Sequence, residues 1–82
     1  MQRYCLIMCR SLTYAQRSSQ VLEHYRHCAQ STAKRFKDRM YYCVKLYESR
    51  LVRALALLDR AAIQRGKVYR LLEDGTYQEV TV

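Results

Sequence analysis

The first hydrophobic segment of the chain is a run of six apolar residues, Tyr4 to Cys9, with an arginine on either side. A continuous apolar run of this length is typical of a short central strand that is buried on both faces. The pattern therefore predicts that the chain begins with a strand inside a sheet.

A helix is expected next, because Ser11 and Thr13 offer hydroxyl groups that can cap its first turn. Thr13 with Gln16 three residues later matches a capping box. The apolar residues that follow share one helical face: Tyr14, Val21, Leu22 and Tyr25.

The segment from Arg26 to Arg39 allows two interpretations, because no glycine or proline marks where the helix ends. In the first, one long helix runs from Leu12 to Lys37, since apolar and small residues recur at intervals of three and four. In the second, Cys28 to Ala33 is an edge strand and Lys34 to Arg39 is a basic loop. The periodicity alone favours the long helix.

The next segment, Met40 to Tyr47, alternates in the way that a strand does. One set of alternating residues is expected to face the core: Met40, Tyr42, Val44 and Leu46. The other set is expected to face solvent: Tyr41, Cys43, Lys45 and Tyr47.

A second helix is predicted from Arg50 to Gln64, with Gly66 as its left-handed C-terminal cap. Its apolar stripe consists of Leu51, Leu55, Leu58 and Ala62. The strands Val68 to Leu72 and Tyr77 to Thr81 then flank Glu73 to Thr76, whose Asp-Gly pair is a strong hairpin signal.

These elements predict one α+β domain over residues 1–82. With a strand at Cys28 to Ala33, the order is β-α-β-β-α-β plus one C-terminal hairpin strand, the ferredoxin-like arrangement with both helices on one face of an antiparallel sheet. The alternative replaces the second strand with a long first helix.

Composition favours a reduced cytoplasmic protein. No apolar run approaches the roughly 18 residues of a membrane span, and no cleavage site follows the short apolar N-terminus. The four cysteines are accompanied by only two glycines and no proline, which is unlike a loop-rich disulfide scaffold.

The charge allows two interpretations, an anionic partner or a surface whose arginines are simply solvated. Fifteen Lys and Arg residues against seven Asp and Glu residues give a net charge of +8, and arginine suits phosphate and carboxylate groups. No phosphate-binding glycine loop, catalytic triad or carboxylate pair is evident, so we expect a non-enzymatic protein without a cofactor.

Four segments resemble the selenium/sulfur carrier-like family, small domains encoded near cysteine-desulfurase-like enzymes. The segments are Cys5 to Gln16 (CLIMCRSLTYAQ), Tyr42 to Leu46 (YCVKL), Gly66 to Arg70 (GKVYR) and Asp74 to Glu79 (DGTYQE). The resemblance implies a ferredoxin-like fold, which favours the strand at Cys28 to Ala33. It also implies a carrier function with a desulfurase-like partner.

The chain departs from the family at two positions. Family members end the first helix at a small residue plus glycine and carry a Cys-Gly pair, with the carrier thiol, at the start of the third strand. Here Tyr25-Arg26 and Met40-Tyr41 stand at these positions. Because a thioether has no ionisable thiol, the alignment implies that carrier chemistry is lost or has moved to Cys43.

Two cysteines are candidate thiols, and both predictions depend on a lowered pKa. Lys45 lies two residues from Cys43 on the expected solvent side of the strand, where it would favour the thiolate. Cys9 ends the first strand just before the helix, whose dipole and the adjacent Arg10 would lower its pKa. Cys5 is assigned to the core.

The alternating strand also suggests a nucleic-acid or anion-binding surface, because aromatic and basic residues together resemble the surface on which sheet-based RNA modules stack bases. Its candidate residues are Arg3, Lys34, Arg35, Lys37, Arg39, Tyr41, Lys45 and Tyr47. An uncovered tyrosine face could instead form a homodimer.

No metal site is expected from His24, His27 and Cys28, which lack a second ligand cluster.

Overall fold

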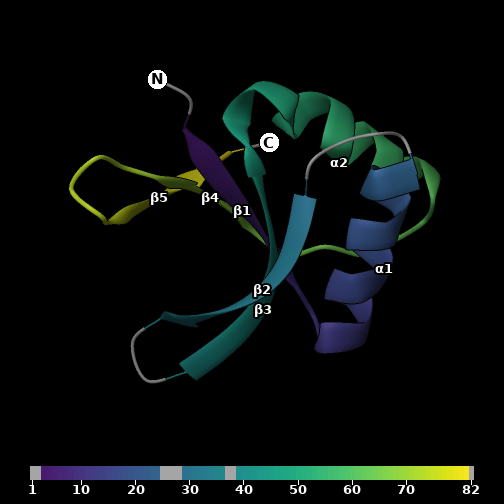
Figure 1. Cartoon of the computed structure of the whole chain (residues 1–82), viewed down its shortest axis with the longest axis horizontal. Helices are drawn as coiled ribbons and strands as arrows, with labels where there is room; N and C mark the ends of the chain where they lie inside the picture. Colours follow the sequence, from purple (N-terminus) through teal and green to yellow (C-terminus); the bar gives the residue numbers. More distant parts are fainter. Residues whose placement is uncertain (1–2, 25–28, 37–38, 82) are drawn as a thin grey trace.

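The computed structural model of the chain has two helices and a five-stranded sheet, and it describes residues 3–24, 29–36 and 39–81 (Figure 1). A 3₁₀ turn, η1, covers Glu48–Arg50. The helices and strands are β1 (Tyr4–Cys9), α1 (Leu12–His24), β2 (Ala29–Phe36), β3 (Arg39–Tyr47), α2 (Leu51–Arg60), β4 (Val68–Leu71) and β5 (Tyr77–Val80).

The strands lie in the order β2-β3-β1-β4-β5, and every neighbouring pair is antiparallel. The first four strands and two helices form the expected ferredoxin-like arrangement, and β5 extends the sheet as the partner of β4. The long first helix is wrong, because α1 ends at His24 and residues 29–36 pair with β3. Residues 25–28, with Tyr25, His27 and Cys28, lie outside the described residues.

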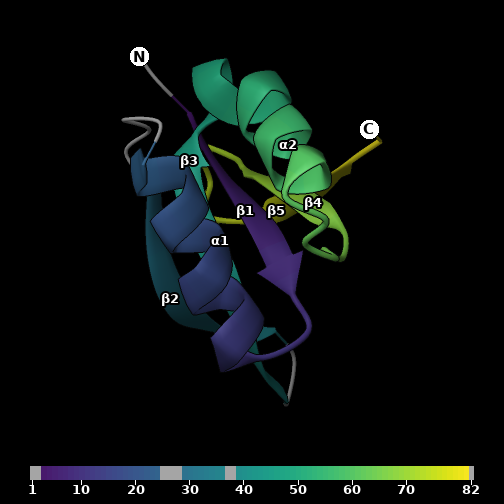
Figure 2. The same ribbon diagram turned by 90° about the vertical axis from the view of Figure 1, so that its right-hand side faces the viewer.

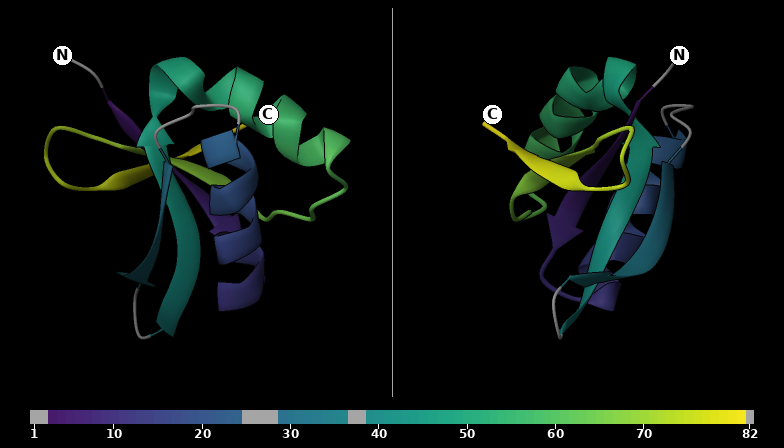
Figure 3. Two further views of the ribbon diagram at one scale, coloured as in Figure 1. Left: turned by 45° about the vertical axis from the view of Figure 1, so that its right-hand side comes forward. Right: turned by 90° about the vertical axis from the view of Figure 1, so that its left-hand side faces the viewer.

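Both helices cover the same face of the sheet (Figure 2). Seen from the opposite side, the other face has no helix over it in the described part of the chain (Figure 3). The main core lies between the helices and the sheet and includes Cys5, Ile7, Val44, Leu46, Leu22, Leu55 and Leu58.

The central strand β1 contributes to cores on both faces of the sheet. Cys5, Ile7 and Cys9 belong to the helix-side core, whereas Leu6 and Met8 form a second cluster on the opposite face. All five residues are buried, which confirms the prediction that this apolar run is a two-sided strand.

Ser11 caps α1, because its Oγ accepts a hydrogen bond from the Tyr14 N–H at 3.4 Å. Thr13 lies inside the helix, so the capping box predicted for it is wrong. The buried Ser18 is satisfied locally, since its Oγ donates to the Tyr14 carbonyl at 2.8 Å. Such a bond to the preceding turn lets a small hydroxyl side chain be buried in a helix.

The hairpin formed by β2 and β3 is longer than the sequence predicts. Lys34 and Arg35 lie in β2 and Arg39 begins β3, so the basic loop predicted over these positions is wrong, while Lys37 lies outside the described residues. In Figure 1 the end of β2 and the start of β3 lie away from both helices.

The early residues of β3 are therefore not core residues. Met40 is 59% exposed and Tyr42 is 39% exposed, against the prediction that both face the core. Val44 and Leu46, farther along the same strand face, are buried as expected. Alternation shows which residues of a strand share one face of the sheet. How deeply each of them is buried depends on where the helices lie over that face.

The second helix is shorter than predicted, since α2 ends at Arg60. Ala62 has the positive φ of a left-handed cap, 57°, in place of the predicted Gly66, and it is exposed. The Ile63 N–H donates to the Leu58 carbonyl and the Ala62 N–H donates to the Asp59 carbonyl, each at 3.0 Å. This pair of bonds is a Schellman motif, which satisfies the last carbonyls of a helix.

The hairpin between β4 and β5 forms where the Asp-Gly signal predicts it. Gly75 has a φ of 87°, a conformation that glycine adopts without strain. The Asp74 carboxylate accepts hydrogen bonds from the Thr76 N–H at 2.9 Å and from the Thr76 hydroxyl at 2.6 Å. These bonds stabilise the charged form and lower the pKa of the Asp74 carboxyl.

Within the described part of the chain, no helix has the length and hydrophobicity needed to cross a bilayer.

The left-handed Ala62 generates a stability prediction. Substitution Ala62→Gly should raise the free energy of unfolding by about 0.5–1 kcal/mol, because glycine removes the Cβ strain at positive φ. Urea unfolding monitored by circular dichroism measures the change.

The matched control is Ala56→Gly, the same substitution at an exposed position within α2. It should lower the free energy of unfolding by about 0.5–1 kcal/mol, since glycine is unfavourable inside a helix. Destabilisation of similar size by both substitutions would contradict the left-handed cap.

Candidate nucleic-acid interface

The sheet face opposite the helices carries a group of partly exposed tyrosines around one lysine. They come from four strands, because alternate residues of β1, β3, β4 and β5 point to this side. We call this surface the tyrosine face, and it consists of Tyr4, Tyr41, Lys45, Tyr47, Tyr69 and Tyr77.

Tyr4, Lys45 and Tyr47 form a compact cluster at one end of this face. Tyr4 and Tyr47 are directly opposite in the β1–β3 register, and their rings stack with centroids 4.8 Å apart. Their hydroxyl groups are 3.3 Å apart, and Tyr4 donates to Tyr47. The Lys45 ammonium lies 4.3 Å from the centroid of the Tyr4 ring, a cation–π contact that holds its charge at the face.

The middle of the same face is a small apolar cluster in which Leu6, Met8 and Cys43 are buried and Tyr69 and Tyr77 pack against them. Tyrosine suits this position because its ring covers apolar atoms while its hydroxyl can remain in contact with water. The tyrosines therefore serve as the outer layer of a second core as well as a surface.

Cys43 differs from its prediction, because its side chain is fully buried, with 0% exposure, in place of the expected solvent position. The alternation assigned it correctly to the side opposite Val44, but the side chains of β1, β4 and β5 cover that side. Its neighbour Lys45 contacts Tyr4.

Cys9 is also buried, and the predicted lowering of its pKa is wrong. Burial raises the pKa of the Cys9 thiol, and this effect outweighs a hydrogen bond with Ser18 that lowers it. The thiol lies 3.5 Å from the Ile7 carbonyl, to which it donates. Burial likewise raises the pKa of Cys5, the predicted core cysteine, with a further contribution from the Glu48 charge.

The predicted basic residues of the described chain come from the start of β1 and from the β2–β3 hairpin. Arg3 is exposed immediately before β1 and precedes Tyr4 in the sequence. Lys34 stands opposite Tyr41 in the β2–β3 register, and Arg35 stands opposite Met40. Arg39 opens β3. The structure thus brings Tyr41, Lys45 and Tyr47 to one face, with the backbone positions of three of the other candidates on the adjoining hairpin.

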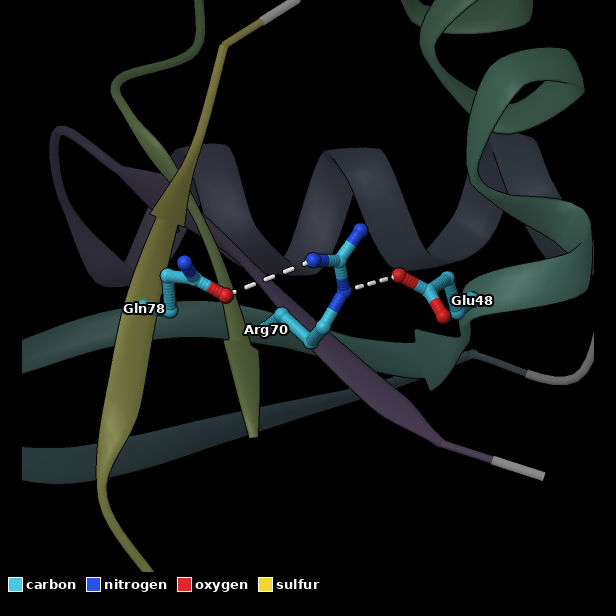
Figure 4. A network of polar contacts seen from close by, with 3 residues as sticks. All are labelled: Glu48, Arg70 and Gln78. Carbon is cyan, nitrogen blue, oxygen red and sulfur yellow. Dashed lines mark hydrogen bonds and ion pairs between the residues drawn. The ribbon is translucent and has the colours of Figure 1, made fainter. Parts of the chain in front are cut away.

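A separate polar network links β4 with η1 and β5 on the helix side of the sheet (Figure 4). Arg70 of β4 forms an ion pair with Glu48 of η1 and donates a second hydrogen bond to Gln78 of β5 at 3.4 Å. Because Arg70 stands opposite Cys5 in the register, it belongs to the helix side of the sheet. Its guanidinium is therefore structural and does not contribute charge to the tyrosine face.

His24 ends α1, and no group of three or more acidic, histidine or cysteine side chains in the described part of the chain could hold a metal ion. His27 and Cys28 lie outside the described residues.

Comparison of the chain with protein-family models, with curated proteins and with solved structures gives no match. The resemblance to the carrier-like family therefore stays a prediction, and the candidate function depends on the geometry of the face.

The buried thiols predict slow reaction with Ellman's reagent. In a Cys28→Ser variant, Cys5, Cys9 and Cys43 should each react at least about tenfold more slowly in the folded protein than in urea, because burial limits access and raises the pKa of Cys5 and Cys9. The absorbance of the released thiolate at constant pH measures the rates. Rapid reaction of one equivalent in the folded variant would contradict this burial.

Proposed function

We propose that the chain is a non-enzymatic module that binds single-stranded nucleic acid on its tyrosine face. The observation that carries the proposal is the combination on one uncovered sheet face of a lysine-capped tyrosine stack, Tyr4–Tyr47 with Lys45, and the exposed Tyr41 of the same strand β3.

Aromatic rings on an open sheet are suited to stacking with unpaired bases, because every base has a planar face that a ring can contact. Tyr41 is 36% exposed, which leaves part of its side chain accessible. Tyr41 and Tyr47 are six residues apart on β3, or about 20 Å at the rise of a strand. Sheet-based RNA modules stack two or three bases on aromatic side chains of this kind.

Charge favours nucleic acid over self-association. The chain carries a net charge of +8, and Lys45 lies within the face. A homodimer through this face would bring two such surfaces together and would repel itself electrostatically. A phosphate backbone would instead be attracted to the same cations, and its condensed counterions would be released.

The proposal predicts salt-dependent binding of a fluorescein-labelled oligouridylate, measured by fluorescence anisotropy. The logarithm of the binding constant should fall with the logarithm of salt concentration by about 0.7 for each phosphate neutralised on a single strand. Lys45→Gln should reduce this slope by about 0.7, and Tyr41→Ala should weaken binding by about 1–3 kcal/mol through lost stacking.

Arg53→Gln is the matched control, because it removes one positive charge from an exposed position on α2, in the helix layer. It should leave the slope unchanged. Equal loss of slope in both variants would show that binding follows net charge and does not use the tyrosine face. Absence of binding at low salt would overturn the proposal, and a concentration-dependent dimer in sedimentation would then favour the homodimer.

The carrier function implied by the family resemblance is a separate hypothesis, tested by incubation with a cysteine desulfurase and cysteine followed by intact-mass spectrometry. We expect no added sulfur on Cys9 or Cys43, because both thiols are buried and the pKa of Cys9 is raised. A persulfide on either residue, located by peptide mapping, would favour the carrier function. Substitution of that cysteine by serine should then abolish the adduct.

A further inference from the structure

A cleft of about 480 Å³ opens at the Tyr41 end of the tyrosine face. This volume lies within the range of about 300–1,000 Å³ that small-molecule sites occupy. Its walls come from the end of β1, the start of β3 and the segment between α2 and β4, with Met8, Cys9, Arg10, Tyr41, Gln64, Arg65, Gly66, Lys67 and Tyr69 as lining residues.

The segment that forms one wall is fixed against β1 by backbone hydrogen bonds. The Gly66 N–H donates to the Met8 carbonyl at 2.7 Å, and the Met8 N–H donates to the Lys67 carbonyl at 2.9 Å. A Cβ at Gly66 would lie 3.3 Å from the Met8 carbonyl oxygen, tighter than an ordinary contact. Glycine therefore allows this close approach without displacing the Met8 carbonyl, and the arrangement places Arg65 and Lys67 on either side of it.

The charged side chains that line the cleft are all cationic. Arg10, Arg65 and Lys67 line it, and no acidic side chain is among its described lining residues. Lys67 has an ion-pair partner, Glu79, at 3.3 Å, whereas Arg10 forms no ion pair with another described residue.

Arg65 combines an ion pair with one unsatisfied guanidinium N–H. Its Nε is buried and has no hydrogen-bond partner among the described residues. The closest acidic oxygen, Oδ1 of Asp59, is 3.7 Å away. A buried guanidinium N–H is normally hydrogen-bonded, so this N–H keeps the capacity to donate to a water molecule or an anion that reaches it. Asp59 is not among the lining residues of the cleft.

Aromatic side chains complete the cleft, since Tyr41 and Tyr69 belong both to its lining and to the tyrosine face. A ligand that matches this arrangement has an anionic group for the arginines and a planar ring for the tyrosines. We infer that the cleft binds the terminal phosphomonoester of a nucleic-acid strand whose following bases lie on the tyrosine face. This inference rests on the proposed function and adds recognition of a strand end.

A competition experiment tests the inference. Four unlabelled oligouridylates displace a labelled strand: ten nucleotides with hydroxyl ends, the same with a 5′-phosphate, the same with a 3′-phosphate, and twelve nucleotides with hydroxyl ends. The longest strand controls for charge, because a phosphomonoester adds about 1.5–2 negative charges at neutral pH. One of the phosphorylated strands should bind about tenfold more tightly than both hydroxyl strands.

Variants locate this preference. The preference is the dissociation constant of the ten-nucleotide hydroxyl strand divided by that of the tighter phosphorylated strand. Arg65→Gln and the exposed Arg10→Gln should each reduce this ratio toward one, while Arg53→Gln should leave it unchanged. Arg10→Gln keeps the test valid if Arg65→Gln disturbs folding through the loss of its contact with Asp59. A preference that survives both cleft substitutions would overturn the assignment to this cleft.

The failure of the inference differs from the failure of the proposed function. Equal affinity of all ten-nucleotide strands would overturn end recognition while the tyrosine face still binds. If no strand binds, titration with uridine 5′-monophosphate, followed by amide chemical shifts of Gln64 to Lys67, decides the matter. Shifts there would support a phosphomonoester site that takes a free nucleotide, and their absence would overturn the site altogether.

Discussion

Burial of β1 on both faces is the constraint on which the rest of the sheet depends. Ile7 contacts the helix-side core, while Leu6 and Met8 require cover on the other side. Full burial of one such side chain contributes about 1.5–3 kcal/mol, so leaving either face of β1 in water would be costly for a domain of this size. The two helices satisfy one face, and the second must be covered by side chains from the neighbouring strands.

Tyrosine side chains cover the second face of β1. The tyrosine face, which we propose as a binding surface, therefore also stabilises the fold. Tyr69 and Tyr77 pack against Leu6, Met8 and Cys43, yet they remain partly exposed. A phenylalanine there would cover the cluster without offering a polar group to water. The Tyr4–Tyr47 pair adds a stacked contact that places Lys45 over an aromatic ring. Packing and presentation of charge are thus achieved by the same residues.

The sequence predicts most of the elements because the strongest signals are local, although periodicity alone favours a long helix in place of β2. The apolar run of β1, the Asp-Gly turn and the alternation of β3 each depend on neighbouring residues alone. Most of the errors lie where distant elements decide the outcome. Cover from β1, β4 and β5 buries Cys43, and no described helix covers Met40. The cleft was missed for the same reason, since its arginines are 55 residues apart in sequence, at positions 10 and 65. The position of the cap is a local error, because an alanine takes the left-handed conformation that glycine usually occupies.

The place of the cleft at one end of β3 gives the surface a direction. A strand held by its terminal phosphate near Tyr41 would extend along β3 toward Tyr47, and the opposite orientation would leave that phosphate beside the stacked pair and away from Arg65. Such a protein would occupy the ends of chains, where exonucleases and ligases act, and would leave the interior of a long molecule accessible. Its occupancy would then scale with the number of breaks or termini and not with the total length of nucleic acid.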